Sequence, residues 1–88
     1  MSGFNLSGLN LSRTDLRGVN LAEADLSQTD LSEAHLEGAY LWQTNLNGAN
    51  MRGTFLEHTY LRSADLTGAD LTGAEFHQTV MPNGEVYE

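Results

Sequence analysis

Cysteine is absent from this 88-residue chain, and basic residues are scarce. The lack of cysteine excludes disulfides and thiolate metal sites. Four Lys or Arg residues stand against twelve Asp or Glu residues, which gives a net charge of −8. Because nucleic-acid binding depends on Lys and Arg at the phosphates, this balance argues against direct binding of DNA or RNA.

Long apolar runs are also missing. No stretch approaches membrane-spanning length, and residues 1–20 lack the charged start and apolar block of a secretion signal. We therefore expect a soluble, cytoplasmic protein that does not contact a membrane. The length indicates one domain. Low apolar content with high net charge is typical of disorder, but here the apolar residues are strictly periodic.

A large apolar residue recurs at every fifth position, and we call it the centre of its repeat. The residue two before it, the small position, is Ala or Thr from Ala24 onward. The residue directly before the centre, which we call the pre-centre residue, is usually Asn or Asp. The two residues after the centre are the first and second corner positions. Glycine recurs at the second corner. The centres are Leu6, Leu11, Leu16, Leu21, Leu26, Leu31, Leu36, Leu41, Leu46, Met51, Leu56, Leu61, Leu66, Leu71, Phe76 and Met81.

The period of five fits neither an α-helix nor a long strand. It fits a short extended piece in which the small residue and the centre point to the same side, followed by a corner that favours glycine. Four such sides make a square coil of twenty residues. The sequence therefore predicts an all-β parallel β-helix of about four coils, stacked at about 4.8 Å.

Several repeats resemble the pentapeptide-repeat family, whose motif is A(D/N)LXX. Ala24-Asp25-Leu26, Ala49-Asn50-Met51, Ala64-Asp65-Leu66 and Ala69-Asp70-Leu71 match it closely. The resemblance covers residues 4–81 and implies a right-handed quadrilateral β-helix, while it defines no common function. We expect a single domain over residues 1–88, with repeats at 4–81 and a C-terminal cap at 82–88.

The first coil has bulky residues at three small positions: Phe4, Leu9 and Val19. Such residues would overfill an ordinary coil. A solenoid must cap its open ends, so we interpret these three side chains as a plug at the N-terminal end.

At the other end, Pro82 cannot donate a ladder hydrogen bond, and Asn83-Gly84 is a turn signal. We expect the helix to stop there and residues 85–87 to fold back over the last coil as a cap. The alternative is an end-to-end homodimer, which the family resemblance implies is common at this terminus. Its surface would consist of Phe76, Val80, Met81, Val86 and Tyr87.

Pre-centre residues twenty apart should stack in ladders. Two ladders alternate Asn with Asp, and this alternation moves like charges from roughly 5 Å to about 10 Å apart. Much of the acidity is therefore expected to belong to the scaffold. The two ladders are Asn5, Asp25, Asn45, Asp65 and Asn10, Asp30, Asn50, Asp70.

The other two faces break the Asn/Asp pattern with aromatic residues on adjoining sides of the middle coils. One interpretation is cross-strand stacking, with Tyr40 against Tyr60 and Arg62 against Trp42, each worth roughly 0.5–1 kcal/mol. The other is a protein-binding patch, since Trp, Tyr and Arg are enriched at interface hot spots. The candidate patch comprises His35, Tyr40, Trp42, Phe55, His58, Tyr60 and Arg62.

No catalytic, cofactor or metal constellation is present in the sequence. The glycines recur at corners and do not open a helix. His35, His58 and His77 lack ligand spacing, and Glu37 and Glu57 are expected on a convex side without a pocket. We therefore expect no enzyme, no cofactor and no metal.

Two functions remain open. The first is a non-catalytic interaction or scaffold module whose protein partner the sequence does not identify. The second follows from the family resemblance: some acidic members mimic B-form DNA, bind DNA gyrase or another type II topoisomerase, and confer protection from quinolones. A net charge of −8 is low for that role in a monomer, because DNA has about one charge per 1.7 Å.

Overall fold

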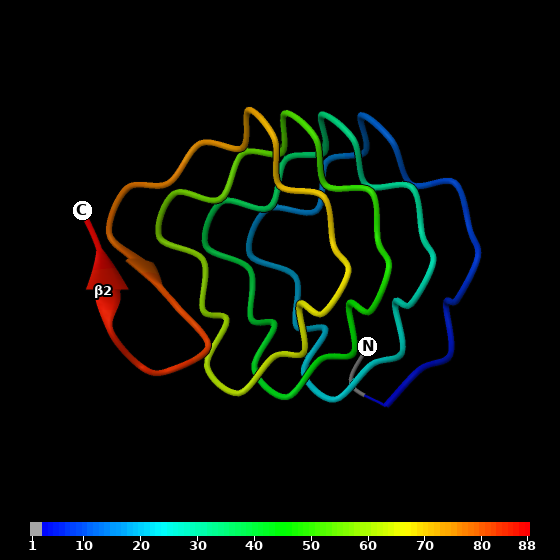
Figure 1. Cartoon of the computed structure of the whole chain (residues 1–88), viewed down its shortest axis with the longest axis horizontal. Helices are drawn as coiled ribbons and strands as arrows, with labels where there is room; N and C mark the ends of the chain where they lie inside the picture. Colours follow the sequence, from blue (N-terminus) through cyan, green and yellow to red (C-terminus); the bar gives the residue numbers. More distant parts are fainter. Residues whose placement is uncertain (1–2) are drawn as a thin grey trace.

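The computed structural model describes residues 3–88, which wind into a right-handed coil of four turns (Figure 1). Pre-centre residues twenty apart form parallel backbone bridges, from Asn5 with Asp25 to Tyr60 with Val80. Around each bridge two hydrogen bonds join neighbouring coils. For example, the Leu26 amide donates to the Asn45 carbonyl at 2.7 Å. The predicted quadrilateral parallel β-helix is confirmed.

Longer strands are limited to the C-terminal end. Within residues 3–88 they are β1 (Thr79–Val80) and β2 (Val86–Tyr87), which pair antiparallel. The sides of the coils contribute single bridges because each extended piece is only a few residues long before the next corner. No helix in the described part of the chain is long and apolar enough to cross a membrane.

The core is a column of centre side chains along the axis of the coil. The nine centres from Leu21 to Leu61 are at most 1 % exposed. Leu6, Leu11 and Leu16 at one end, and Leu66 and Leu71 at the other, are partly buried. The repeat thus places nearly all large aliphatic side chains in one shared interior.

Threonines at small positions do more than leave room for the centres. Thr44, Thr59 and Thr79 are fully buried, and each hydroxyl donates to the carbonyl of the leucine 23 residues earlier, over 2.6–2.8 Å. Thr54 makes the same bond to Leu31 at 3.1 Å. Buried hydroxyls are costly without a partner, so these bonds make threonine acceptable in the core and join consecutive coils.

The second corner position adopts the left-handed backbone conformation in every repeat from Gly8 to Gln78. At Gly38 φ is +72°, and at Gln43, which has no glycine freedom, φ is +59°. Asn or Asp at the pre-centre position supports these corners, because its Oδ1 accepts the amide hydrogen of the first corner residue. Asp25, for instance, accepts from Ser27 at 3.0 Å. The expected preference for glycine at the corner is explained by this geometry.

The expected N-terminal plug is only partly formed. Val19 packs against the core, but Phe4 and Leu9 are 52 % and 46 % exposed. These residues belong to the first coil, and no described segment lies beyond them to cover their side chains. Two of the three expected plug residues therefore form an exposed apolar end.

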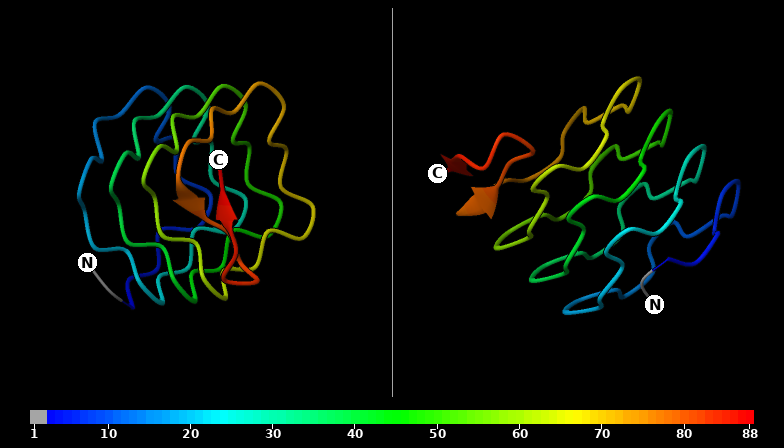
Figure 2. Two further views of the ribbon diagram at one scale, coloured as in Figure 1. Left: turned by 90° about the vertical axis from the view of Figure 1, so that its left-hand side faces the viewer. Right: turned by 90° about the horizontal axis from the view of Figure 1, so that it is seen from below.

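The C-terminal end folds back as expected. Pro82 still accepts a hydrogen bond from the Ser63 amide, and the Met81–Gly84 turn follows, closed by the Gly84 amide on the Met81 carbonyl at 2.8 Å. β2 then returns beside β1 across the last coil (Figure 2). The rings of Phe76 and Tyr87 lie 5.0 Å apart. Val86 and Tyr87 remain about half exposed, and the homodimer alternative for this end stays a prediction.

Candidate protein-binding site

Two stacked pairs of rings occupy the faces where the Asn/Asp ladders are interrupted. The rings of Tyr40 and Tyr60 lie 5.0 Å apart and 5° from parallel. On the adjoining face, His35 and Phe55 lie 4.5 Å apart and 8° from parallel. Each pair stands on a backbone bridge between neighbouring coils. The coil spacing therefore sets the spacing of the rings.

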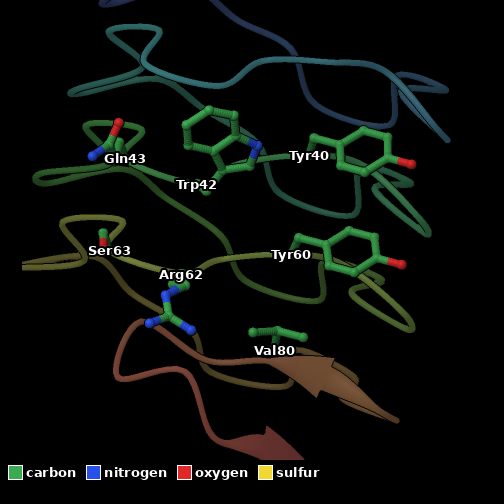
Figure 3. A pocket seen from close by; sticks show the side chains of 7 residues that line it. All are labelled: Tyr40, Trp42, Gln43, Tyr60, Arg62, Ser63 and Val80. Carbon is green, nitrogen blue, oxygen red and sulfur yellow. The ribbon is translucent and has the colours of Figure 1, made fainter.

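A groove of about 420 Å³ runs beside the tyrosine stack, and we call it the aromatic groove. Figure 3 shows the two tyrosines on one side of it and Trp42 on the other, with Val80 below. Tyr40, Trp42 and Tyr60 are each 41–44 % exposed although they are large. The lining residues are Tyr40, Trp42, Gln43, Tyr60, Arg62, Ser63 and Val80.

Arg62 does not stack on Trp42, so that part of the stacking interpretation is wrong. Its guanidinium points away from the indole, toward the turn that precedes β2 (Figure 3). A Cβ placed on Gly84 would be 3.2 Å from Arg62 Nη1. The absence of a side chain at Gly84 leaves room for the guanidinium there, whereas a stack would need the long side chain to fold back along the axis. Only Tyr40 and Tyr60 form the expected stacked pair on this face.

The charges near the groove differ from those elsewhere on the chain. The other three arginines each lie within 4 Å of a carboxylate: Arg13 with Glu33, Arg17 with Asp15 and Arg52 with Asp70. Among residues 3–88, no carboxylate lies within that distance of Arg62. None of the residues that line the groove is acidic. The groove is thus an aromatic surface with one accessible cation.

The aromatic residues replace side chains that stabilise the scaffold. Asn20, in the coil before Tyr40, accepts the amide hydrogen of Ala22 at 3.0 Å. A phenol ring at Tyr40 or Tyr60 cannot make this local bond, and such bonds are worth about 1 kcal/mol. Stacking of the two rings offsets part of the loss.

The adjoining face contains the rest of the predicted patch. His35 Nδ1 lies 3.3 Å from Glu37 Oε2. His58 and His77 approach each other across one coil, with ring centroids 5.8 Å apart. One buried oxygen each of Glu37 and Glu57 has no hydrogen-bond partner. Within residues 3–88, no group of three or more His, Cys, Asp or Glu side chains is arranged to hold a metal ion.

The structure therefore divides the predicted patch. It gathers Tyr40, Trp42, Tyr60 and Arg62 around the groove and leaves His35, Phe55 and His58 on the adjoining face. Sequence reasoning missed Gln43 and Ser63, although both are corner residues of the same face. It assigned Val80 to the C-terminal surface, whereas this residue also lines the groove, because it stacks directly on Tyr60.

Several surface carboxylates are hydrogen-bonded to residues of their own corners. A hydrogen bond from the Ser27 hydroxyl, and then one from its amide, lowers the pKa of Asp25. Ser32 lowers the pKa of Asp30 in the same way, and Thr67 that of Asp65. The pKa of Asp15 is lowered furthest, first through the hydrogen bond from the Arg17 side chain. These carboxylates are held ionised by their own corners, as expected of scaffold charges.

The fold defines a right-handed β-solenoid with a five-residue repeat, and the sequence comparison agrees. The family model described as pentapeptide repeats (8 copies) matches residues 1–32, 29–68 and 39–78. This chain belongs to the pentapeptide-repeat family. Members of the family are generally non-enzymatic structural or interaction modules. None of the curated proteins compared with this chain matches it significantly.

Several solved structures share the fold. HetL, a pentapeptide-repeat protein involved in heterocyst differentiation regulation in the cyanobacterium Nostoc sp. strain PCC 7120, is 33 % identical with a TM-score of 0.60. The alignment covers 98 % of this chain and 42 % of HetL. Rfr23 from the cyanobacterium Cyanothece 51142 is 34 % identical with a TM-score of 0.53, over 89 % of this chain and 60 % of Rfr23. This chain thus spans less than two thirds of either relative.

QnrB1, a plasmid-mediated fluoroquinolone resistance protein, has the same fold at lower identity. It is 20 % identical with a TM-score of 0.58, and the alignment covers 85 % of this chain and 49 % of QnrB1. At this identity the likeness concerns the fold alone.

Proposed function

We propose that this chain is a non-catalytic interaction module that binds another protein through the aromatic groove. The observation that supports the proposal is the concentration of exposed Tyr40, Trp42 and Tyr60 around one accessible arginine, Arg62. Trp, Tyr and Arg are the residue types that contribute most to binding energy at protein interfaces. The repeat itself requires none of them at these positions.

The scaffold also suits this role. Tyr40, Tyr60 and Val80 stand on backbone bridges beside the fully buried Leu41 and Leu61, so the backbone that holds this wall of the groove is fixed before a partner arrives. A preorganised surface loses little conformational entropy on binding. The aromatic groove is open to solvent, so it would not exclude water from a reaction.

The charge distribution favours this function over mimicry of DNA. Over the 30 Å long axis, B-form DNA would present about eighteen charges, whereas this chain has a net charge of −8. The groove interrupts the acidic surface with aromatic rings and a cation. For a DNA mimic, inhibition of gyrase supercoiling at low salt and a dimer in light scattering are expected. We expect neither.

Affinity capture from the native host tests the proposal. The wild-type chain and the Trp42→Ala variant serve as baits, and Thr67→Ala, at an exposed corner of a polar face, is the matched control. We expect a specific protein to be retained by the wild-type and Thr67→Ala baits and lost with Trp42→Ala. Retention by all three baits would show that the groove is the wrong surface.

The double variant Tyr40→Ala/Tyr60→Ala separates binding from stacking. Loss of both rings should lower the melting temperature through the lost stack, worth about 0.5–1.5 kcal/mol, and should also abolish capture while the chain stays folded. A lower melting temperature with undiminished capture would leave the tyrosines with a stabilising role only.

A further inference from the structure

The two walls of the aromatic groove leave space for a side chain between them. Tyr40 and Trp42 flank the buried centre Leu41, so both side chains point outward, and their Cα atoms are about 6–7 Å apart. A ring in van der Waals contact with both walls needs about 3.5–4.0 Å on each side, or about 7–8 Å between the wall atoms, so the two side chains must diverge from their Cα spacing to admit it. Figure 3 shows the two side chains on opposite sides of the groove, with open space between them.

The walls also present hydrogen-bond donors beside their apolar surfaces. The Trp42 indole N–H and the Tyr40 and Tyr60 hydroxyls are side-chain groups for which no partner is found within residues 3–88. Polyproline II segments have free backbone carbonyls because this conformation has no internal hydrogen bonds. Aromatic-lined grooves with such donors are a general means of binding them.

Arg62 adds a charge preference. It is the groove's single charged residue, and no described carboxylate lies within ion-pair distance of it. Arginine pairs with carboxylates through two parallel hydrogen bonds. On a chain of net charge −8, an acid-free groove with an accessible arginine is complementary to a carboxylate and not to a basic segment.

We propose that the aromatic groove binds an extended, proline-containing segment of a partner protein in which an acidic residue lies near the proline. The proline ring inserts between Tyr40 and Trp42, and the carboxylate pairs with Arg62. This inference rests on the proposed function and specifies the chemistry of its partner.

The geometry sets the spacing between the two anchors. Trp42 and Arg62 stand one coil apart, about 4.8 Å, and the arginine side chain extends several ångströms further toward the turn at Gly84 (Figure 3). A polyproline II segment advances about 3.1 Å per residue. The acidic residue is therefore expected about two to four residues from the proline.

Selection from a random peptide library displayed on phage tests the proposal even while the partner protein is unidentified. Baits are the wild-type chain, Trp42→Ala and Arg62→Gln, with Arg52→Gln as the matched control because Arg52 lies outside the groove beside Asp70. We expect peptides selected by wild type and Arg52→Gln to share a proline with Asp or Glu two to four residues away. Arg62→Gln should lose the acidic preference, and Trp42→Ala should lose the proline.

Titration with a selected synthetic peptide gives the affinities directly. Trp42 is the single tryptophan of the chain, so its fluorescence reports on the groove. Replacing the peptide's acidic residue by its amide should weaken binding to wild type about fivefold, on a scale where 1.4 kcal/mol is about tenfold. With Arg62→Gln the same replacement should have no effect.

Three outcomes would overturn the proposal. The first is that the selected peptides lack the proline and the acidic residue. The second is that replacing the peptide's carboxylate by its amide weakens binding to Arg62→Gln as much as binding to wild type. The third is that Trp42 fluorescence changes with protein concentration alone, which would place a second copy in the groove. If Trp42-dependent capture of a protein still occurs in the first two cases, the groove binds a different protein surface and only this inference fails. Absence of any Trp42-dependent capture refutes the proposed function itself.

Discussion

The hydroxyl of Thr59 donates a hydrogen bond of 2.6 Å to the carbonyl of Leu36, one coil earlier in the solenoid. Thr59 is fully buried. The Leu36 carbonyl also accepts the Ala39 amide hydrogen at 2.9 Å, so the Thr59 hydroxyl bonds to the second lone pair of this carbonyl oxygen. The small position of the repeat is thus a place where consecutive coils are joined as well as packed.

Replacing Thr59 by valine keeps the side-chain shape and removes this bond. We expect the free energy of unfolding to fall by about 1–2 kcal/mol, because a buried hydrogen bond is lost. Thr67→Val removes a hydroxyl at an exposed corner, where its bond to Asp65 competes with water, and should therefore cost less. Urea denaturation of both variants measures the difference, and equal stabilities would contradict a stabilising role for the buried hydroxyl.

The left-handed corner predicts opposite effects for two substitutions. At Gly38, φ is +72° and an added Cβ would contact nothing within 4 Å, so Gly38→Ala tests backbone strain alone. We expect a loss of about 1 kcal/mol, since left-handed strain exceeds the entropy gained by restricting the unfolded chain. Gln78→Gly, at φ +50°, should be neutral or stabilising by roughly 0.5 kcal/mol. Thermal denaturation gives both signs, and destabilisation by Gln78→Gly would refute the strain argument.

The alternation of Asn and Asp can be tested by breaking it. Asn45 bridges Asp25 on one side and Asp65 on the other. Asn45→Asp therefore places three carboxylates in direct succession, and like charges opposite one another destabilise a sheet. We expect a lower melting temperature that recovers in high salt, because salt screens exposed charges.

Asn47→Asp is the control for this experiment. It adds the same charge at a corner whose neighbours in the stack, Ser27 and Thr67, are uncharged. Its melting temperature should fall less and should depend less on salt. Similar falls for both variants would attribute the effect to net charge instead of the ladder.

The pH dependence of stability follows from the ladder carboxylates. The pKa of Asp25 is lower in the folded chain than its ordinary value of 3.8, owing to the Ser27 hydroxyl and then the Ser27 amide. The unfolded chain therefore binds more protons as the pH falls. The stabilisation is fully present above the unfolded pKa and is lost as the pH falls through the folded one. We expect the melting temperature to decrease as the pH is lowered from about 5 to below 4.

Ser27→Ala should raise the pKa of Asp25 toward its ordinary value, because the larger of its two hydrogen bonds is removed. Ser63→Ala, a serine at a second corner of the groove face, is the control. Carboxyl chemical shifts measured by NMR across the pH range give the midpoint. An unchanged midpoint with Ser27→Ala would show that the hydroxyl does not hold the carboxylate ionised.

The interior of the protein was predictable because the repeat is short and every coil places its centre residues in the same way. Five-residue spacing of Leu26, Leu31, Leu36 and Leu41 is enough to place them on one axis, and all four are fully buried. The fold-back after Pro82 was predictable for a similar reason, since a missing amide donor and a glycine turn act locally. The same reasoning stacked Tyr40 on Tyr60 correctly.

The ends and the long side chains were less predictable. Phe4 and Leu9 were expected to close the first coil and are about half exposed, because nothing in the described chain lies beyond them to bury them. One of the two interpretations stacked Arg62 on Trp42, whereas its guanidinium lies beside the turn at Gly84. The direction of a flexible side chain depends on neighbours that the repeat does not specify.

The sequence by itself determined the coil, its four sides, its buried column and the separation of charge in the two Asn/Asp ladders, because each depends on spacing within five or twenty residues. Tertiary structure decided the aromatic groove. Its walls come from Tyr40, Trp42 and Tyr60, but its lower end is closed by Val80 and its cation is placed by the C-terminal turn. These contacts join the regular coil to the irregular C-terminal segment, residues 82–88, and only the folded chain fixes where this segment lies.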